Sequence, residues 1–344
     1  MTSTAKSLSS FRFVSKRYFL LPGLLLGGGI LVFAFLWSIG KGAAEIDRQV
    51  VYDALVHHDD TNFSHLIIQL VRLPRVLSGM IVGASLAVAG ALMQGLTRNP
   101  LADPGLLGIT SGATFAVVMS LYLLDDPSLS NYALFAFIGS ATAGAIVYGL
   151  GSMGRGGSTP LKLTLAGVIV SAFISSFTAA ILVTDQQTLD QIRFWMAGSL
   201  AGREMPLFRQ TAPYMLFGLG MALVLARQIT TISLGEDVAR GLGQNTVWVK
   251  GLAAVAITLL AGGAVALAGP IGFVGLIVPH LARMLVGADY RWIIPYSALM
   301  GALLVIVADV YARILIKPQE IPVGVMLALI GTPFFIYLAR WRVK

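Results

Sequence analysis

The fold class is decided by the sequence PRVLSGMIVGASLAVAGALMQGL (residues 74–96), which is apolar along almost its whole length. A helix of about 20 apolar residues crosses the roughly 30 Å hydrocarbon core of a bilayer. The rest of the chain has the same character, being 56% hydrophobic and only 12% charged, with a mean hydropathy of +0.81. Soluble domains carry about 25% charged residues. The composition therefore indicates a membrane protein.

About ten apolar runs are long enough to be spans. They lie at 18–39, 74–96, 105–124, 132–151, 163–183, 210–226, 247–268, 271–287, 292–314 and 322–339. We therefore expect an all-α membrane protein with one multi-pass domain over residues 1–344. The first run is too long for the core of a signal peptide and is followed by no clear cleavage pattern, so it predicts a retained helix. The 38 glycines suit close contacts between helices.

The distribution of charge predicts the orientation of the chain. Most of the 24 Lys and Arg residues fall in the N-terminal tail (1–17), in the loops after the even-numbered runs and at the C-terminus. Most acidic residues fall in the other loops. Because basic loops stay in the cytoplasm, both termini and the loop 227–246 are predicted to be cytoplasmic. The net charge of +8 thus reflects topology and not nucleic-acid binding.

Two arginines, Arg72 and Arg75, lie on the predicted outer side at the start of the second run. Pro74 suits the first position of a helix, which would place Arg75 in the first turn, against the helix dipole. One hypothesis is that both guanidinium groups bind carboxylates of an external partner. The alternative is that they anchor the helix in the lipid headgroups.

A carboxylate lies inside the ninth run. Asp309 and Arg313 are four residues apart, so both lie on one helical face and a salt bridge between them is expected. Intramembrane carboxylates are functional candidates, and a proton-coupled carrier could use Asp309 as its relay. A carboxylate with a built-in arginine partner nevertheless favours a structural ion pair.

Other site types find little support. The chain has no cysteine, and the HHDD sequence at 57–60 lacks the spacing of a metal site, so neither a catalytic cluster nor a metal site is predicted. Gly149, Gly151 and Gly154 fit G-x-G-x-x-G, but they close a membrane helix and do not join a strand to a helix. No G-x-x-x-x-G-K-[ST] sequence occurs. If ATP drives this protein, another chain must bind it.

The predicted cytoplasmic loop contains the polar sequence SLGEDVARGLGQ (233–244). Ser233 and Glu236 have capping-box spacing, which predicts a helix starting at Leu234, and Gly243 can end it. Leu234, Val238 and Leu242 form one apolar stripe on this helix. So short a helix requires a surface to pack on. The stripe has few basic or bulky residues, which favours a protein groove over the bilayer interface.

Four sequences together resemble the permease subunits of the iron-siderophore, haem and vitamin B12 ABC importers. They are RLPRVLSGMIVGASLAVAGALMQGLTRNPLADPGLLGITSGA, LGEDVARGLG, ALAGPIGFVGLIVPHLARMLVG and ADVYARILIKPQEIPVGVMLALIGTPFFIYLAR. The resemblance runs from about residue 66 to the C-terminus. It implies ten helices per subunit, a dimer of permease subunits, two ATP-binding subunits and an extracytoplasmic substrate-binding protein.

The resemblance also implies roles for individual residues. Arg72, Arg75 and Arg313 would meet glutamates of the binding protein, which favours docking over headgroup anchoring. Asn99 and Leu101 would belong to one cytoplasmic gate segment, and Ser158 and Thr159 to another. The coupling helix seated in the ATPase would contain Ser233, Leu234, Gly235, Glu236, Val238, Ala239, Arg240, Leu242 and Gly243.

The function implied is ATP-driven import by alternating access in the bacterial cytoplasmic membrane. This chain would bind no cofactor of its own, since ATP and Mg would lie on the partner ATPase. A ferric siderophore is the expected ligand, with vitamin B12 or haem as alternatives. The second permease subunit would be either another copy or a related chain. A self-sufficient proton-coupled carrier using Asp309 is the alternative of another class.

Overall fold

The computed structural model describes residues 19–42, 46–57, 59–124, 128–154, 159–316 and 318–342, and every regular element in these ranges is a helix. Within these described ranges, seven stretches are long and apolar enough to cross a membrane. Five of them are single helices: α1 (Leu20–Gly40), α6 (Leu129–Ser152), α7 (Pro160–Thr184), α9 (Met205–Ser233) and α14 (Tyr290–Ile314). The sixth is the continuous stretch of α3 (Phe63–Ile67), η2 (Ile68–Arg72) and α4 (Leu73–Thr97). The seventh is the continuous stretch of α11 (Thr246–Ile257), η4 (Thr258–Gly262) and α12 (Gly263–Ala268).

Three shorter apolar helices lie where the third, eighth and tenth runs were predicted. They are α5 (Ile109–Leu123), α13 (Val274–Val286) and α15 (Val323–Arg342), in which the described apolar stretch is Val323–Ile336. The remaining helices connect the long ones or lie at their ends. They are α2 (Arg48–Val56), η3 (Pro104–Leu107), α8 (Gln186–Met196) and α10 (Glu236–Gly241).

Two predicted runs, the second and the sixth, are too short, and the second lies in a continuous helix from Phe63 to Thr97. The sixth was expected at 210–226, whereas α9 is a helix of 29 residues. Arg209 and Arg227 lie near its two ends, so a count of apolar residues stops short of both. Pro213 lies inside the helix, where its ring removes one backbone hydrogen bond without ending the helix.

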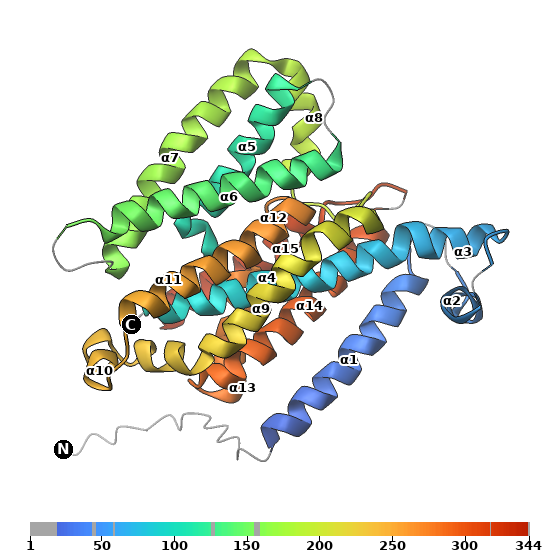
Figure 1. Cartoon of the computed structure of the whole chain (residues 1–344). Coiled ribbons are helices and arrows are strands. Elements are labelled where there is room, and N and C mark those ends of the chain that lie inside the picture. The colour runs from blue at the N-terminus through green and yellow to red at the C-terminus, as the bar shows by residue number, and fades with distance from the viewer. Residues whose placement is uncertain are drawn as a thin grey trace, which may run out of the picture.

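The helix α4 lies at the centre of the bundle, in contact with α9, α13 and α14 (Figure 1). Its contacts depend on glycine. A Cβ atom on Gly83 would lie 2.2 Å from the carbonyl oxygen of Gly301 on α14, and one on Gly90 would lie 1.9 Å from that of Gly275 on α13. Small residues at these crossings let the backbones touch, which is how helices associate in lipid without a hydrophobic driving force.

The helices α5, α6 and α7 form a group beside this centre, drawn in green in Figure 1. Gly112 on α5 and Gly139 on α6 meet in the same manner, because a Cβ on Gly139 would lie 2.2 Å from the Gly112 carbonyl oxygen. The group joins the rest of the bundle mainly through α12 and η4. The first helices pack separately: Val51 and Ala54 of α2 lie in a small buried cluster with Ile306 of α14.

The connecting helices gather at two opposite ends of the bundle. Figure 1 shows α10 and the C-terminus at one end, and α2, α3 and α8 at the other. The predicted cytoplasmic loop 227–246 therefore lies at one end of the bundle. Arg72 and Arg75, which were predicted on the outer side, lie at the other end. We call these the α10 end and the α8 end.

We expect Gly301→Val to destabilise the bundle, because its Cβ would lie 2.3 Å from the Gly83 carbonyl oxygen on α4. Overpacking of this kind costs about 1–3 kcal/mol. Thermal unfolding of the detergent-purified chain measures the effect. Gly28→Val on α1 is the matched control, since a Cβ there meets nothing within 4 Å. Equal melting temperatures for the two variants would contradict the close-contact explanation.

Candidate functional site

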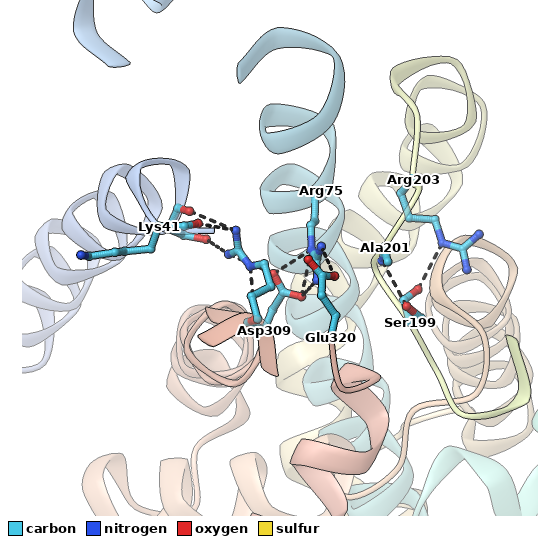
Figure 2. A network of polar contacts seen from close by, with 9 residues as sticks. Lys41, Arg75, Ser199, Ala201, Arg203, Asp309 and Glu320 are labelled. Atoms are coloured by element: carbon cyan, nitrogen blue, oxygen red, sulfur yellow. Dashed lines mark hydrogen bonds and ion pairs between the residues drawn. The ribbon is translucent and has the colours of Figure 1, made fainter. Parts of the chain in front are cut away.

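A buried arginine joins two helices and a loop at the α8 end. Arg75 of α4 donates from Nη2 to Asp309 Oδ1 of α14 at 2.9 Å and from Nη1 to Glu320 Oε2 at 2.8 Å. Figure 2 shows the three side chains converging. Arg75 and Asp309 are buried, whereas the Glu320 side chain is 33% exposed. Glu320 is therefore the partner of Arg75 that can be reached from outside.

The predicted ion pair between Asp309 and Arg313 is confirmed, with Arg313 Nη2 lying 3.1 Å from Asp309 Oδ2. Both side chains are only 3% exposed. Arg313 also donates to the Ser38 hydroxyl at 2.7 Å and to the Lys41 carbonyl at 2.7 Å, at the end of α1 (Figure 2). Asp309 thus lies between two arginines, one from its own helix and one from α4. Spacing in the sequence could predict only the pair with Arg313, which lies on the same helix as Asp309.

Arg72 lies in the same region, where its Nη1 donates to the Ile39 carbonyl at 2.5 Å. The prediction that the helix starts at Pro74 is wrong, because the helix is continuous from Phe63 and Pro74 lies well inside it. The π-helical turn η2 ends at Arg72, two residues before Pro74, and its wider spacing accommodates a residue that has no N–H. Arg75 therefore does not oppose a helix dipole.

All three predicted docking arginines, Arg72, Arg75 and Arg313, are brought together at the α8 end and are buried. Each has hydrogen-bond partners within the chain. Headgroup anchoring requires guanidinium groups that reach the lipid surface, which burial prevents here. Docking through these residues stays a prediction. Such docking would require at least one of these arginines to exchange a hydrogen-bond partner within the chain for a carboxylate of the binding protein.

A further buried arginine was missed in the sequence. Arg203, in the connection between α8 and α9, donates from Nε to the Ser199 carbonyl at 3.1 Å (Figure 2). Burial lowers the pKa of Arg203 to about 10, because desolvation disfavours the charged form. A pocket of about 390 Å³ at the α8 end is lined by Arg203 and Glu320, together with Trp195 of α8. No motif or spacing in the sequence marks Arg203.

The short polar helix at the other end differs from the prediction at its start. Ser233 is the last residue of α9, and its hydroxyl donates to the Thr230 carbonyl at 2.6 Å. The capping box with Glu236 is therefore wrong, and α10 begins at Glu236, not at Leu234. Gly235 precedes it with φ of 133°, a conformation that side chains rarely adopt. Serine prolongs α9 by bonding back to its own helix, and glycine makes the turn.

The predicted end of α10 at Gly243 is confirmed. Gly243 has φ of 79°, its N–H donates to the Arg240 carbonyl at 2.9 Å, and the N–H of Gln244 donates to the Ala239 carbonyl at 3.0 Å. This pair of bonds is the Schellman motif. It satisfies two carbonyls that would otherwise end the helix without partners.

The apolar stripe of this segment points away from the bundle. Leu234, Val238 and Leu242 are 68%, 48% and 71% exposed, whereas Ala239 is buried. Leu234 belongs to the stripe although it precedes the helix. Residues of this kind on an exposed polar segment indicate a surface that another molecule covers.

Glu236 fastens α10 to the bundle. Its carboxylate accepts from Lys250 Nζ of α11 at 2.6 Å and from Arg240 Nη2 at 2.7 Å. Burial alone would raise the pKa of Glu236, but Lys250, Arg240 and the Thr246 hydroxyl hold that pKa below its ordinary value of 4.5. Lys250 was not predicted, because fourteen residues separate it from Glu236 and no helical spacing links them. The contact between Glu236 and Lys250 therefore links α10 to α11.

The described residues of the predicted gate segments form local turns and caps, and Asn99 is exposed. Asn99 accepts from the Leu101 N–H at 3.0 Å, which forms a tight turn after α4, and Thr159 caps α7 by accepting from the Lys162 N–H at 3.3 Å. Ser158 lies outside the described residues. A cavity of about 480 Å³ lies between η3, α5 and α7, and its polar lining includes Asp103.

Comparison with known proteins identifies the family. The FecCD transport family matches residues 30–341. The probable siderophore transport system permease protein YfiZ of Bacillus subtilis (strain 168) is 48% identical over 92% of this chain and 94% of its own. The iron(3+)-hydroxamate import system permease protein FhuB of the same organism is 44% identical over 96% and 85%.

A solved structure of a metal-chelate type ABC transporter, in an inward-facing conformation, superposes with a TM-score of 0.80. It is 31% identical in sequence, and the match covers 94% of this chain and 99% of that one. Family, relatives and fold agree with each other along nearly the whole length. The chain therefore belongs to the FecCD transport family and is a membrane permease.

Proposed function

We propose that this permease is the transmembrane subunit of an ATP-driven importer that moves a ferric siderophore into the bacterial cytoplasm. The observation that carries the proposal is the match to the FecCD family over residues 30–341, with relatives whose names specify siderophore and iron-hydroxamate transport. The sequence contains no phosphate-binding loop of its own. ATP and Mg therefore bind to separate ATPase subunits, and this chain binds no cofactor.

The proposed topology has ten spans with both termini in the cytoplasm. Seven long helices and three shorter apolar ones support that number. The excess of Lys and Arg at the α10 end supports the orientation. In this orientation the α10 end faces the ATPase subunits, and the α8 end faces the extracytoplasmic binding protein. Two permease subunits, alike or related, complete the importer.

The α10 segment is the proposed coupling element. Its exposed stripe of Leu234, Val238 and Leu242 supplies the apolar face for helix-in-groove docking. Glu236 and Lys250 connect it to α11, and Gly235 connects it directly to α9. Closure of the ATPase pair would therefore shift two spans together. This linkage supports alternating access driven from the cytoplasmic side.

At the opposite end, a carboxylate of the binding protein would take the place of Glu320 on Arg75. Glu320 is the exposed member of the network, and Asp309 would keep Arg75 paired during the exchange. Ion pairs at such a rim steer association and fix its register more than they add affinity. Glu320 thus competes with the carboxylate of the binding protein for Arg75.

The ligand is proposed from the relatives, with haem and vitamin B12 as alternatives. The cavity of about 480 Å³ between η3, α5 and α7 is a candidate part of the translocation path in one subunit. A proton-coupled carrier using Asp309 is less well supported. Both oxygens of Asp309 are held by arginines and the side chain is buried, which is the arrangement of a structural pair and not of an accessible relay.

Gentle purification of the tagged chain from its native membrane tests the assembly. We expect a nucleotide-binding chain to co-purify, and the binding protein to join when its ferric ligand is added. Native mass measurement would then separate a homodimer of permeases from a heterodimer. Recovery of the chain without any ATPase, even after mild cross-linking, would contradict the proposal.

Val238→Asp should disrupt ATPase docking, because a charge enters the centre of the exposed stripe. Loss of a central apolar anchor costs about 2 kcal/mol or more, so affinity for the ATPase should fall about 30-fold. Co-purification and ligand uptake measure this effect. Asp237→Ala is the matched control, since Asp237 is exposed on the same helix outside the stripe. Equal losses in both variants would show that the stripe has no special role.

Glu320→Gln should tighten docking of the binding protein by about two- to fivefold, because it removes the competing carboxylate from Arg75. Binding of the purified binding protein to the reconstituted importer, at low and high salt, measures the change. Glu204→Gln is the control, because Glu204 is also an exposed acid at the α8 end. Weaker docking of Glu320→Gln would overturn the competitor role.

A further inference from the structure

Two pockets at the surface of the bundle lie one after the other along the same two helices, α9 and α14. The first is an apolar groove of about 530 Å³ whose floor and walls come from α1, α4, α9 and α14. The second is a polar pocket of about 370 Å³ at the α10 end, lined by Arg227, Thr230, Thr231, Asp289 and Arg291. Neither pocket belongs to the docking network, the coupling segment or the gate segments.

The two pockets are one helical turn apart. On α9, Leu223 lines the groove and Arg227 lines the polar pocket. On α14, Pro295 lines the groove and Arg291 lines the polar pocket. Residues four apart lie on the same face of a helix. The polar pocket therefore lies next to the end of the groove, on the same side of α9 and α14.

The charged end of this combined site favours an anion. Arg227 makes no side-chain ion pair or hydrogen bond with the residues that the structure describes, and Asp289 holds Arg291 at 2.8 Å. The pocket also lies at the N-terminal end of α14, where the helix dipole adds positive potential. Two guanidinium groups against one carboxylate leave a net positive charge.

We propose that these two pockets form a binding site for an anionic phospholipid, with the phosphate between Arg227 and Arg291 and an acyl chain in the groove. An anionic phospholipid joins a phosphate to a long apolar chain, which matches a basic pocket one helical turn from an apolar groove. A helix of another protein would need an acidic residue at this one turn. Basic pockets between spans at the cytoplasmic side are known to suit anionic headgroups.

The headgroup must supply the selectivity. Lipid tails are as apolar as the leucines that line the groove, so an acyl chain gains little hydrophobic free energy by leaving the bilayer for it. Discrimination between lipids should therefore follow the charge of the headgroup. Assignment to the cytoplasmic leaflet rests on the proposed orientation, whereas binding itself does not depend on the importer function.

Native mass spectrometry of the full-length chain, released from nanodiscs of equal parts dioleoyl-phosphatidylglycerol and dioleoyl-phosphatidylcholine, tests the site. We expect phosphatidylglycerol to be retained preferentially, and Arg227→Gln to lower its retention about fivefold. Arg209→Gln, near the other end of α9, is the matched control and should retain it as the wild type does. Equal retention of the two lipids by the wild type would overturn the proposal, as would equal retention by the two variants.

Two further variants distinguish recognition from a loss of folding. Asp289→Asn keeps a side chain that can cap α14 but releases Arg291, so retention of phosphatidylglycerol should rise. Ala298→Trp fills the groove and should lower retention of both lipids alike. Lower phosphatidylglycerol retention in Asp289→Asn would contradict the role of Arg291. If sn-glycerol 1-phosphate stabilises the protein against heat as well as the lipid does, the site binds a free anion and the lipid assignment is wrong.

Discussion

A guanidinium group buried in a membrane protein must be paired, and the pairing of Arg75 with Asp309 organises the α8 end of this permease. The pair joins α4 to α14, Arg313 extends it to the end of α1, and Glu320 brings in the loop before α15. Removing either central partner would leave an uncompensated buried charge, at a cost of about 3–5 kcal/mol. Charge reversal at Arg75 would therefore destabilise the fold, and a change in binding-protein affinity could not be assigned to docking alone. Glu320 is the member of the network at which folding and docking can be separated.

The two ends of the molecule are connected by helices that cannot move independently. α4 and α14 touch backbone to backbone at Gly83 and Gly301, below the ion network. α9 passes from the α8 end to Gly235, where the exposed α10 begins, and Glu236 fastens α10 to Lys250 on α11. If the importer opens one end while it closes the other, these helix contacts would connect the two proposed docking faces.

Local patterns in the sequence predicted local structure well. The long apolar runs became helices, the spacing of Asp309 and Arg313 gave the ion pair, and Gly243 ended α10. The predictions that failed concerned residues that are compatible with either of two local structures. Ser233 can cap a new helix or bond back to the old one, and Pro74 can start a helix or follow a π turn inside it. Partners distant in sequence, such as Arg75 with Asp309 or Glu236 with Lys250, follow from helix packing, which no single-sequence spacing encodes.

We propose that ATP hydrolysis on other chains drives transport through this one. Uptake of radioactive ferric siderophore into vesicles that contain the purified importer, with the binding protein outside and ATP inside, measures this directly. We expect uptake to require both ATP and the binding protein, and we expect that an imposed proton gradient cannot replace ATP. Uptake by the permease alone, driven by a proton gradient and abolished in Asp309→Asn, would contradict it.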